Sequence, residues 1–218
     1  ARPAIAPTFG VENMMGTNPM AIGIPTDEEF PFVIDGAMSI IQRGTIEILS
    51  RNSEPAEPGW VINEQGETMT DSTDILKALL EGRAAFLPLG GADETFGGHK
   101  GYGYAAVVEI LSAALWGGPF MKDLDLNRDH RLGHFLVAID VKSFIEPDTF
   151  KKVAGDICRA LRSSKRAADR DRIYTAGEKE YETEQRRRRE GIPISRSIQK
   201  DLLTMKHEMG LTQYAFKF

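Results

Sequence analysis

Disulfide-forming residues are almost absent from this sequence. Cys158 is the single cysteine among 218 residues, so no disulfide within the chain can stabilise it. This usage is typical of a reducing compartment, and we expect a cytoplasmic protein. A hydrophobic core must then supply the stability, and a chain of this length with 41% hydrophobic residues is long enough to bury one.

The sequence also has no long apolar run and no excess of positive charge. Its most apolar stretch, residues 105–116, includes Glu109 and Ser112 and is too short to cross a bilayer. The net charge of -5 provides no overall positive field for nucleic acid. The arginine run at 186–189 lies among glutamates, which is typical of an ion-paired, solvated helix. We therefore expect neither a membrane nor a nucleic-acid partner.

Metal-binding patterns are incomplete. Residues 123–127 begin like a calcium loop, but Arg128 stands where glycine is needed and His134 where the last glutamate belongs. His130 and His134 have helical spacing, yet they flank Gly133 and have no third ligand nearby. We expect no metal site.

Apolar runs and helical periodicity alternate along the first two thirds of the chain. We predict strands at 19–25, 31–35 and 135–140, the second of them buried, and an irregular surface segment at 53–72. Helices are predicted from a cap at Ser39 to Asn52, and at 74–81, 103–116, 147–164 and 195–209. The helix at 103–116 is apolar nearly all round, which favours burial, and Cys158 lies on the apolar side of its helix.

This alternation indicates an α/β fold, for which we expect a three-layer mixed sheet with flanking helices. The tail is more highly charged. We predict one α/β domain over residues 1–175 and a C-terminal helical arm over 176–218.

A glycine-rich segment, residues 97–103, runs directly into the helix predicted at 103–116. Glycines and a helix N-terminus can approach an anion closely, and Lys100 adds a positive charge. The segment fits neither a P-loop nor a Rossmann fingerprint. The alternative is that the glycines only pack the helix against its neighbours, and the pattern leaves both open.

Asp35 lies at the end of a predicted strand, just before a helix. This is where α/β folds collect ligands, and a carboxylate there could bind ribose hydroxyls. The alternative is a simple helix cap.

Taken together, an ordered set of short motifs resembles the type-2 malate/L-lactate dehydrogenases, which include sulfolactate, ureidoglycolate and diketogulonate dehydrogenases. The motifs are MGTNP at 15–19, VIDGAMS at 33–39, RN at 51–52, GW at 59–60, LPLGG at 87–91, GHKGYG at 98–103, GHF at 133–135 and AGE at 176–178. No single motif is specific, but their order is.

The resemblance implies a homodimer with a non-standard, non-Rossmann fold that binds NAD or NADP. It implies hydride transfer between nicotinamide and a small 2-hydroxy or 2-oxo acid such as malate or lactate. The cofactor contacts that it implies are Asp35, Gly36, Ala37, Met38, Ser39, His99, Lys100, Ala176, Gly177 and Glu178. Thr17 and Asn18 are candidates for substrate contact.

The sequence departs from the family pattern in several places. Residues 92–97 resemble an insertion, and Ala176 stands where proline is usual. The family's catalytic histidine and substrate arginines precede the part that matches Ala1, so we expect this chain to be a C-terminal portion. Two other interpretations stay open: a non-catalytic binding or assembly module, and an unrelated enzyme that binds phosphate through residues 97–103.

Overall fold

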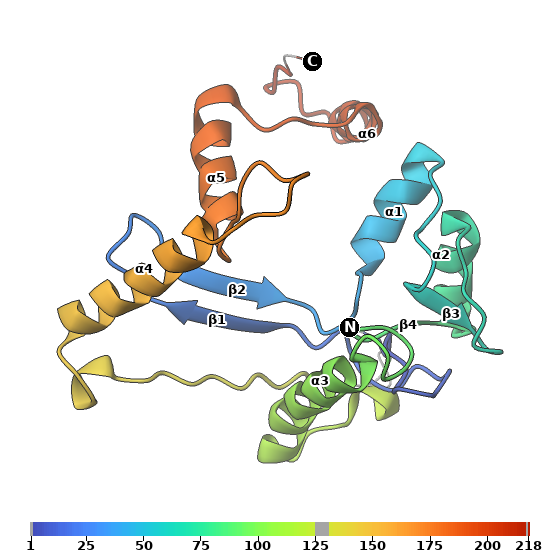
Figure 1. The fold of residues 1–218 in the computed structure, drawn as a ribbon. Coiled ribbons are helices and arrows are strands. Elements are labelled where there is room, and N and C mark those ends of the chain that lie inside the picture. The colour runs from blue at the N-terminus through green and yellow to red at the C-terminus, as the bar shows by residue number, and fades with distance from the viewer. Residues whose placement is uncertain (1, 125–130, 217) are drawn as a thin grey trace. The chain divides into compact units, whose positions relative to one another are not determined.

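The computed structural model describes residues 2–124, 131–216 and 218. The chain forms two compact units, Ala1–Asp156 and Ile157–Phe218, and each is described by itself. The domain boundary predicted after residue 175 stays a prediction. Figure 1 shows the elements in chain order.

The first sheet is an antiparallel hairpin of β1 (Met20–Ile24) and β2 (Phe32–Gly36). Both strands were predicted, and Figure 1 shows them side by side. The expectation that the second strand is buried was wrong, because Ile22 and Ile34 are 44% and 47% exposed. Within the described residues these strands pair only with each other, so no third strand covers them.

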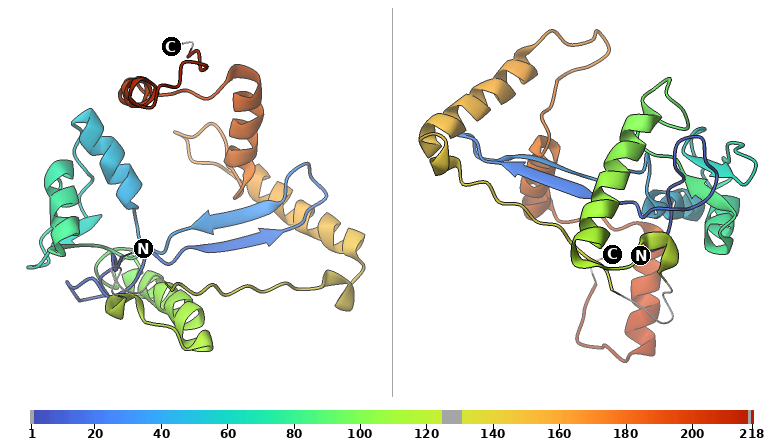
Figure 2. Two further views of the ribbon diagram at one scale, coloured as in Figure 1. Left: turned by 180° about the vertical axis from the view of Figure 1, so that it is seen from behind. Right: turned by 90° about the horizontal axis from the view of Figure 1, so that it is seen from below.

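The second sheet joins β3 (Val61–Asn63) to β4 (Ala84–Phe86), again antiparallel. Helices α1 (Arg43–Asn52) and α2 (Ser72–Glu81) pack against it, and Ile46, Ile75 and Phe86 are core residues at their meeting point. The left view of Figure 2 shows α1 and α2 next to each other. The prediction of an irregular surface at 53–72 was wrong for β3, whose Val61 and Ile62 are buried against strand residues far along the chain.

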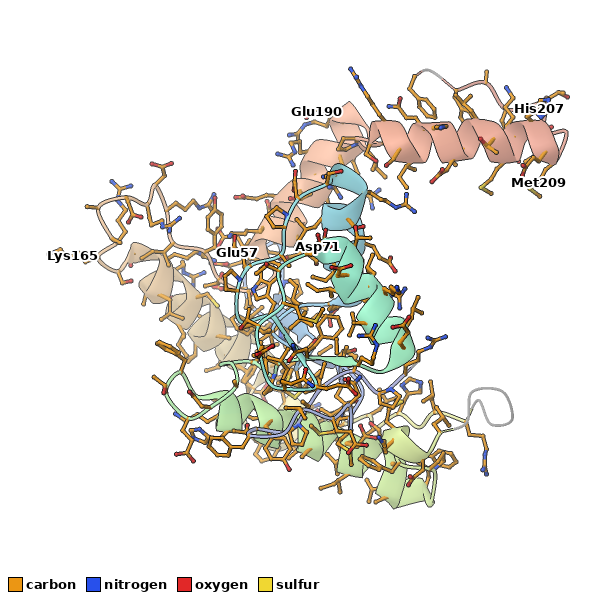
Figure 3. All side chains as sticks on the ribbon, turned by 90° about the vertical axis from the view of Figure 1, so that its right-hand side faces the viewer. Glu57, Asp71, Lys165, Glu190, His207 and Met209 are labelled. Atoms are coloured by element: carbon orange, nitrogen blue, oxygen red, sulfur yellow. The ribbon has the colours of Figure 1, made fainter. Side chains whose placement is uncertain are left out.

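The two helix starts near these sheets differ in how far they were predictable. Asp71, labelled in Figure 3, caps α2 by accepting a hydrogen bond of 2.8 Å from the amide of Asp74. Ser39 does not cap α1. That helix begins at Arg43 after Gln42, because Ser39 instead forms an isolated bridge with Pro88.

Helix α3 (Gly98–Ala113), continued by a 3-10 turn at Ala114–Trp116, begins earlier than predicted. The glycine-rich segment is therefore mostly the first part of the helix itself. The expectation of a buried helix was wrong: Val107 and Ile110 are 50% and 59% exposed. One narrow face is buried, comprising Gly98, Gly101, Ala105 and Glu109.

The strand predicted at 135–140 does not form. These residues run extended before the 3-10 turn at Val141–Ser143, as Figure 1 shows, and Leu136 is 90% exposed. The segment is apolar enough for a strand, but none of the described strands pairs with it. A further 3-10 turn at Met121–Asp123 precedes it.

Helix α4 (Pro147–Ser163) confirms its prediction, and Cys158 is buried as expected. In the second unit, α5 (Glu178–Glu190) is the ion-paired helix that the arginine run indicated, with Arg188 bonded to Glu184 at 2.6 Å. Helix α6 (Arg196–Glu208) is capped by Ser195 and has no buried residue. Figure 3 labels His207 and Met209 at its C-terminal end.

The α/β class is confirmed, whereas the single three-layer mixed sheet is not found. The described residues contain two separate antiparallel sheets, since short strands pair only locally here. In the described part of the chain, no helix has both the length and the apolarity to cross a bilayer. Nor do three potential metal-ligating side chains gather anywhere in that part. Residues 125–130, which include His130 and Arg128, lie outside the described residues.

Candidate functional site

The start of α3 lies directly on the backbone of residues 89–91. A methyl group added at Gly98 would overlap the carbonyl oxygen of Gly91, and one at Gly101 would overlap that of Leu89. Only glycine permits this approach. The packing role that the sequence left open therefore accounts for two of the glycines.

The apparent insertion at 92–97 closes over the same helix start. The amide of Gly98 donates to the carbonyl of Asp93 at 2.9 Å, and that of Gly97 donates to Glu94 at 3.1 Å. These helix-start amides are thus used within the chain, unlike in an open anion cradle. The side chains of His99 and Lys100 are still available to meet an anion, and both residues are exposed.

The predicted cofactor segment at 35–39 lies next to this helix start. The amide of Leu89 donates to the carbonyl of Met38 at 2.9 Å. Met38 also packs with Ala105 of α3 in one buried cluster. The structure therefore brings two segments together that are separated by about sixty residues of sequence.

The residues of the segment at 35–39 differ in their exposure to solvent. Ala37, Met38 and Ser39 are buried, whereas Asp35 is exposed and Gly36 is half-buried. The hydroxyl of Ser39 is buried, and no described residue forms a hydrogen bond with it. Asp35 is thus the polar group of the segment that a ligand can reach without a rearrangement.

The predicted substrate residues form a turn on the buried face of α3. Asn18 is 7% exposed, and its φ of 45° is in the left-handed region. Its side-chain amide donates to the carbonyl of Ala105 and to Glu109, both at 2.8 Å. The carbonyl of Thr17 accepts from the amide of Met38 at 2.8 Å. The turn therefore connects α3 to the predicted cofactor segment.

Glu109 is a site residue that sequence reasoning missed. Its carboxylate is buried and accepts from Asn18, from the amide of Gly16 at 3.3 Å and from the amide of Met121 at 2.9 Å. The available signal was a single acidic residue inside an apolar helix, since a buried charge needs specific partners. In the sequence, the same residue serves only as evidence against a membrane span.

A cavity of about 680 Å³ opens beside this turn. Thr17, Asn18 and Glu109 line it together with three arginines and a histidine, namely Arg2, Arg43, Arg131 and His134. Arg43 also pairs with Glu47 at 2.8 Å, on the exposed side of α1. The cavity can therefore offer cationic and hydroxyl groups to a small anion.

Ala176, Gly177 and Glu178 lie in the second unit, at the start of α5. Gly177 has a φ of 91° and precedes the first helical residue. Glu178 is 3% exposed, and its carboxylate accepts from the amide of Thr175 at 3.0 Å and pairs with Arg172. That carboxylate is occupied, so the backbone at 176–177 is the accessible part of this predicted contact.

Arg172, the partner of Glu178, has further interactions in the same unit. A hydrogen bond to Glu182, with attraction from Glu178, raises the pKa of its guanidinium. Its guanidinium lies 4.6 Å from the ring centre of Tyr174, and Lys179 lies 4.7 Å from the same ring. Two cationic side chains therefore lie over the ring of Tyr174, and Glu178 and Glu182 neutralise one of them.

Comparison with known proteins gives the same family as the motifs. The family model described as malate/L-lactate dehydrogenase matches residues 1–203. A malate dehydrogenase of Pyrococcus horikoshii is 35% identical over 213 residues, which cover 97% of this chain and 58% of that protein. A Δ1-pyrroline-2-carboxylate/Δ1-piperideine-2-carboxylate reductase of Pseudomonas aeruginosa is 31% identical, covering 92% of this chain and 56% of the reductase.

A solved structure agrees. The crystal structure of malate dehydrogenase from Entamoeba histolytica superposes with a TM-score of 0.91 at 39% identity, covering all of this chain and 61% of the other. The chain thus spans about 58% of the length of the curated malate dehydrogenase that it matches. It belongs to the malate/L-lactate dehydrogenase family.

Proposed function

We propose that this chain forms the nicotinamide-cofactor-binding part of an oxidoreductase that acts on a small 2-hydroxy or 2-oxo acid. The observation that carries the proposal is the meeting of three predicted site segments around α3. The segments are the turn at 17–18, the segment at 35–39 and the helix start at His99 and Lys100. If these segments served only to pack the core, they would not need to lie next to one another.

The residues present fit a dinucleotide with anionic and hydroxyl groups. Lys100 is exposed on the first turn of α3, where the helix dipole adds to its charge. Asp35 is exposed and can accept hydrogen bonds from ribose hydroxyls. We also propose that the binding site is not of the Rossmann type. The titration below distinguishes NAD from NADP. The bound nicotinamide would supply the hydride.

The cavity beside Thr17 is our candidate for the acid substrate. A 2-oxo acid carries a carboxylate, and the lining includes Arg2, Arg43 and His134. Guanidinium groups bind carboxylates through paired hydrogen bonds. Malate dehydrogenases among the relatives make oxaloacetate the first acid to test.

A cofactor titration tests the proposal. We expect the full chain to bind NADH or NADPH, detected by nicotinamide fluorescence, and Lys100→Ala to weaken binding about tenfold, as expected for loss of a charge-assisted contact. Lys77→Ala, an exposed lysine on α2, is the matched control and should bind like the parent chain.

Any of three results would count against the proposal. Equal losses in Lys100→Ala and Lys77→Ala would mean that the effect is one of net charge alone. No binding of either cofactor by the folded chain would favour a non-catalytic module. Phosphate binding without a preference for nicotinamide nucleotides would favour the unrelated phosphate-binding enzyme.

A further inference from the structure

Glu109 connects three separate segments of the first unit. The Oε2 atom accepts from the side chain of Asn18 and from the amide of Gly16, and Oε1 accepts from the amide of Met121. Its side chain forms no ion pair with any described lysine or arginine, although the residue is only 8% exposed. Two backbone amides and one side-chain amide therefore hold this carboxylate, without a cation among the described residues.

Burying a carboxylate in this way costs desolvation free energy, so its presence here needs an explanation. Desolvation disfavours the charged form, and only a full set of hydrogen bonds offsets it. An apolar residue at this position would fill the space without that cost. The carboxylate, however, provides two acceptor oxygens and no donor, which is what three converging N–H groups require.

The residue that these bonds enclose is Thr17. Gly16 and Asn18, on either side of it, are both bonded to Glu109, and the carbonyl of Thr17 accepts from Met38. The Thr17 hydroxyl forms no hydrogen bond with any residue that the structure describes, and Thr17 lines the 680 Å³ cavity. Thr17 is thus held by its backbone from two sides, while its hydroxyl is left available.

We propose that Glu109 is a positioning residue for the acid-binding cavity: it holds the turn at 16–18 so that the Thr17 hydroxyl can meet the substrate. This inference rests on the proposed function, because the cavity is assigned there to the acid. It adds a residue that does not itself need to touch the substrate. It also couples the cavity to the Met38 segment through the carbonyl of Thr17.

Glu109→Gln is the most informative variant because it keeps size and shape. Glutamine has one oxygen, so its amino group must face either Met121 or the Gly16–Asn18 pair, and two donors then oppose each other. Glu57→Gln is the matched control, and it should change none of the measurements below. Glu57 is exposed in the first unit, outside the lining of the cavity, and its side chain forms no hydrogen bond or ion pair within the described residues.

Amide hydrogen exchange on the full chain tests the coupling without any need for activity. We expect Glu109→Gln to raise exchange about tenfold at Gly16 or Met121 and also at Met38, which does not bond to Glu109. The amide of Ile75, in the core around α2, should be unchanged and shows that the fold persists. An unchanged Met38 amide would overturn the coupling, because Glu109 would then act only locally.

A second experiment measures the binding of oxamate, a non-reducible analogue of a small 2-oxo acid, to the NADH-bound chain. We expect Glu109→Gln and Thr17→Val each to weaken oxamate binding about tenfold, and the double variant to lose little more. NADH affinity should stay within a factor of about two. Additive losses, or no loss, would overturn the inference. Failure of the parent chain to bind NADH would instead overturn the proposed function.

Discussion

The side-chain amide of Asn18 donates a hydrogen bond of 2.8 Å to the carboxylate of Glu109, although 91 positions separate the two residues. Asn18 has a φ of 45°, in the left-handed region that asparagine tolerates better than most other non-glycine residues. The same amide also donates to the carbonyl of Ala105. One side chain thus anchors the turn at 16–18 to α3.

We expect Asn18→Ala to destabilise the first unit by about 3 kcal/mol, because it removes a hydrogen bond to a buried charge and keeps the unfavourable φ. Asn18→Gly loses the same bonds but removes the backbone strain, so it should cost about 1 kcal/mol less. Urea unfolding followed by the fluorescence of Trp60 and Trp116 measures both. Equal stabilities for the two variants would mean that the left-handed backbone contributes no strain.

A second prediction separates two glycines of α3. Gly101→Ala should destabilise by about 3 kcal/mol, because the added methyl group would overlap the backbone of Leu89. Gly103→Ala meets nothing within 4 Å and should stabilise by roughly 0.5–1 kcal/mol through helix propensity. Thermal unfolding compares them directly. A stabilising Gly101→Ala would contradict the close packing of α3 on residues 89–91.

The third prediction concerns Ser39, whose substitution should affect stability and cofactor binding differently. Its hydroxyl is buried without a partner among the described residues, so Ser39→Ala should leave stability unchanged or raise it by about 1 kcal/mol. If a bound cofactor, directly or through a water, satisfies the hydroxyl, NADH binding should weaken about threefold in the same variant. Unfolding and titration experiments together check this. A destabilised variant with unchanged binding would indicate a purely structural hydroxyl.

The fourth prediction concerns the start of α5 in the second unit. Glu178→Ala should cost about 2 kcal/mol locally, because it leaves the Thr175 amide without its buried acceptor, while Arg172 keeps Glu182. Glu182→Ala removes an exposed partner of the same arginine and should cost less than about 1 kcal/mol. Hydrogen exchange at the Thr175 amide distinguishes them. Similar exchange in both variants would mean that Glu178 does not hold the turn at 176–178.

Several elements were predictable because their signals are local. Ser195 caps α6 through a bond to an amide three residues ahead, and the alternation of charge along α5 stabilises that helix within its own turns. The hairpin strands likewise follow from apolar runs next to turn residues. Such signals depend only on neighbours in sequence.

Other elements could not be predicted from their own residues. The segment at 135–140 is apolar and β-branched, yet it forms no strand because no described partner pairs with it. Short β3, by contrast, forms because Ala84–Phe86 lies beside it. Strand formation is a property of pairs, and the pairing partner is not encoded locally.

By itself, the sequence determined the family, through its ordered motifs, and the helices whose caps and charge pairs lie within a few residues. Tertiary structure alone decided that Ser39 is buried rather than a helix cap, that Gly98 and Gly101 of α3 serve close packing, and that Glu109 joins Gly16, Asn18 and Met121. The physical reason is that burial and the pairing of buried polar groups depend on where distant segments meet, whereas caps and helical charge pairs depend on the nearest turn.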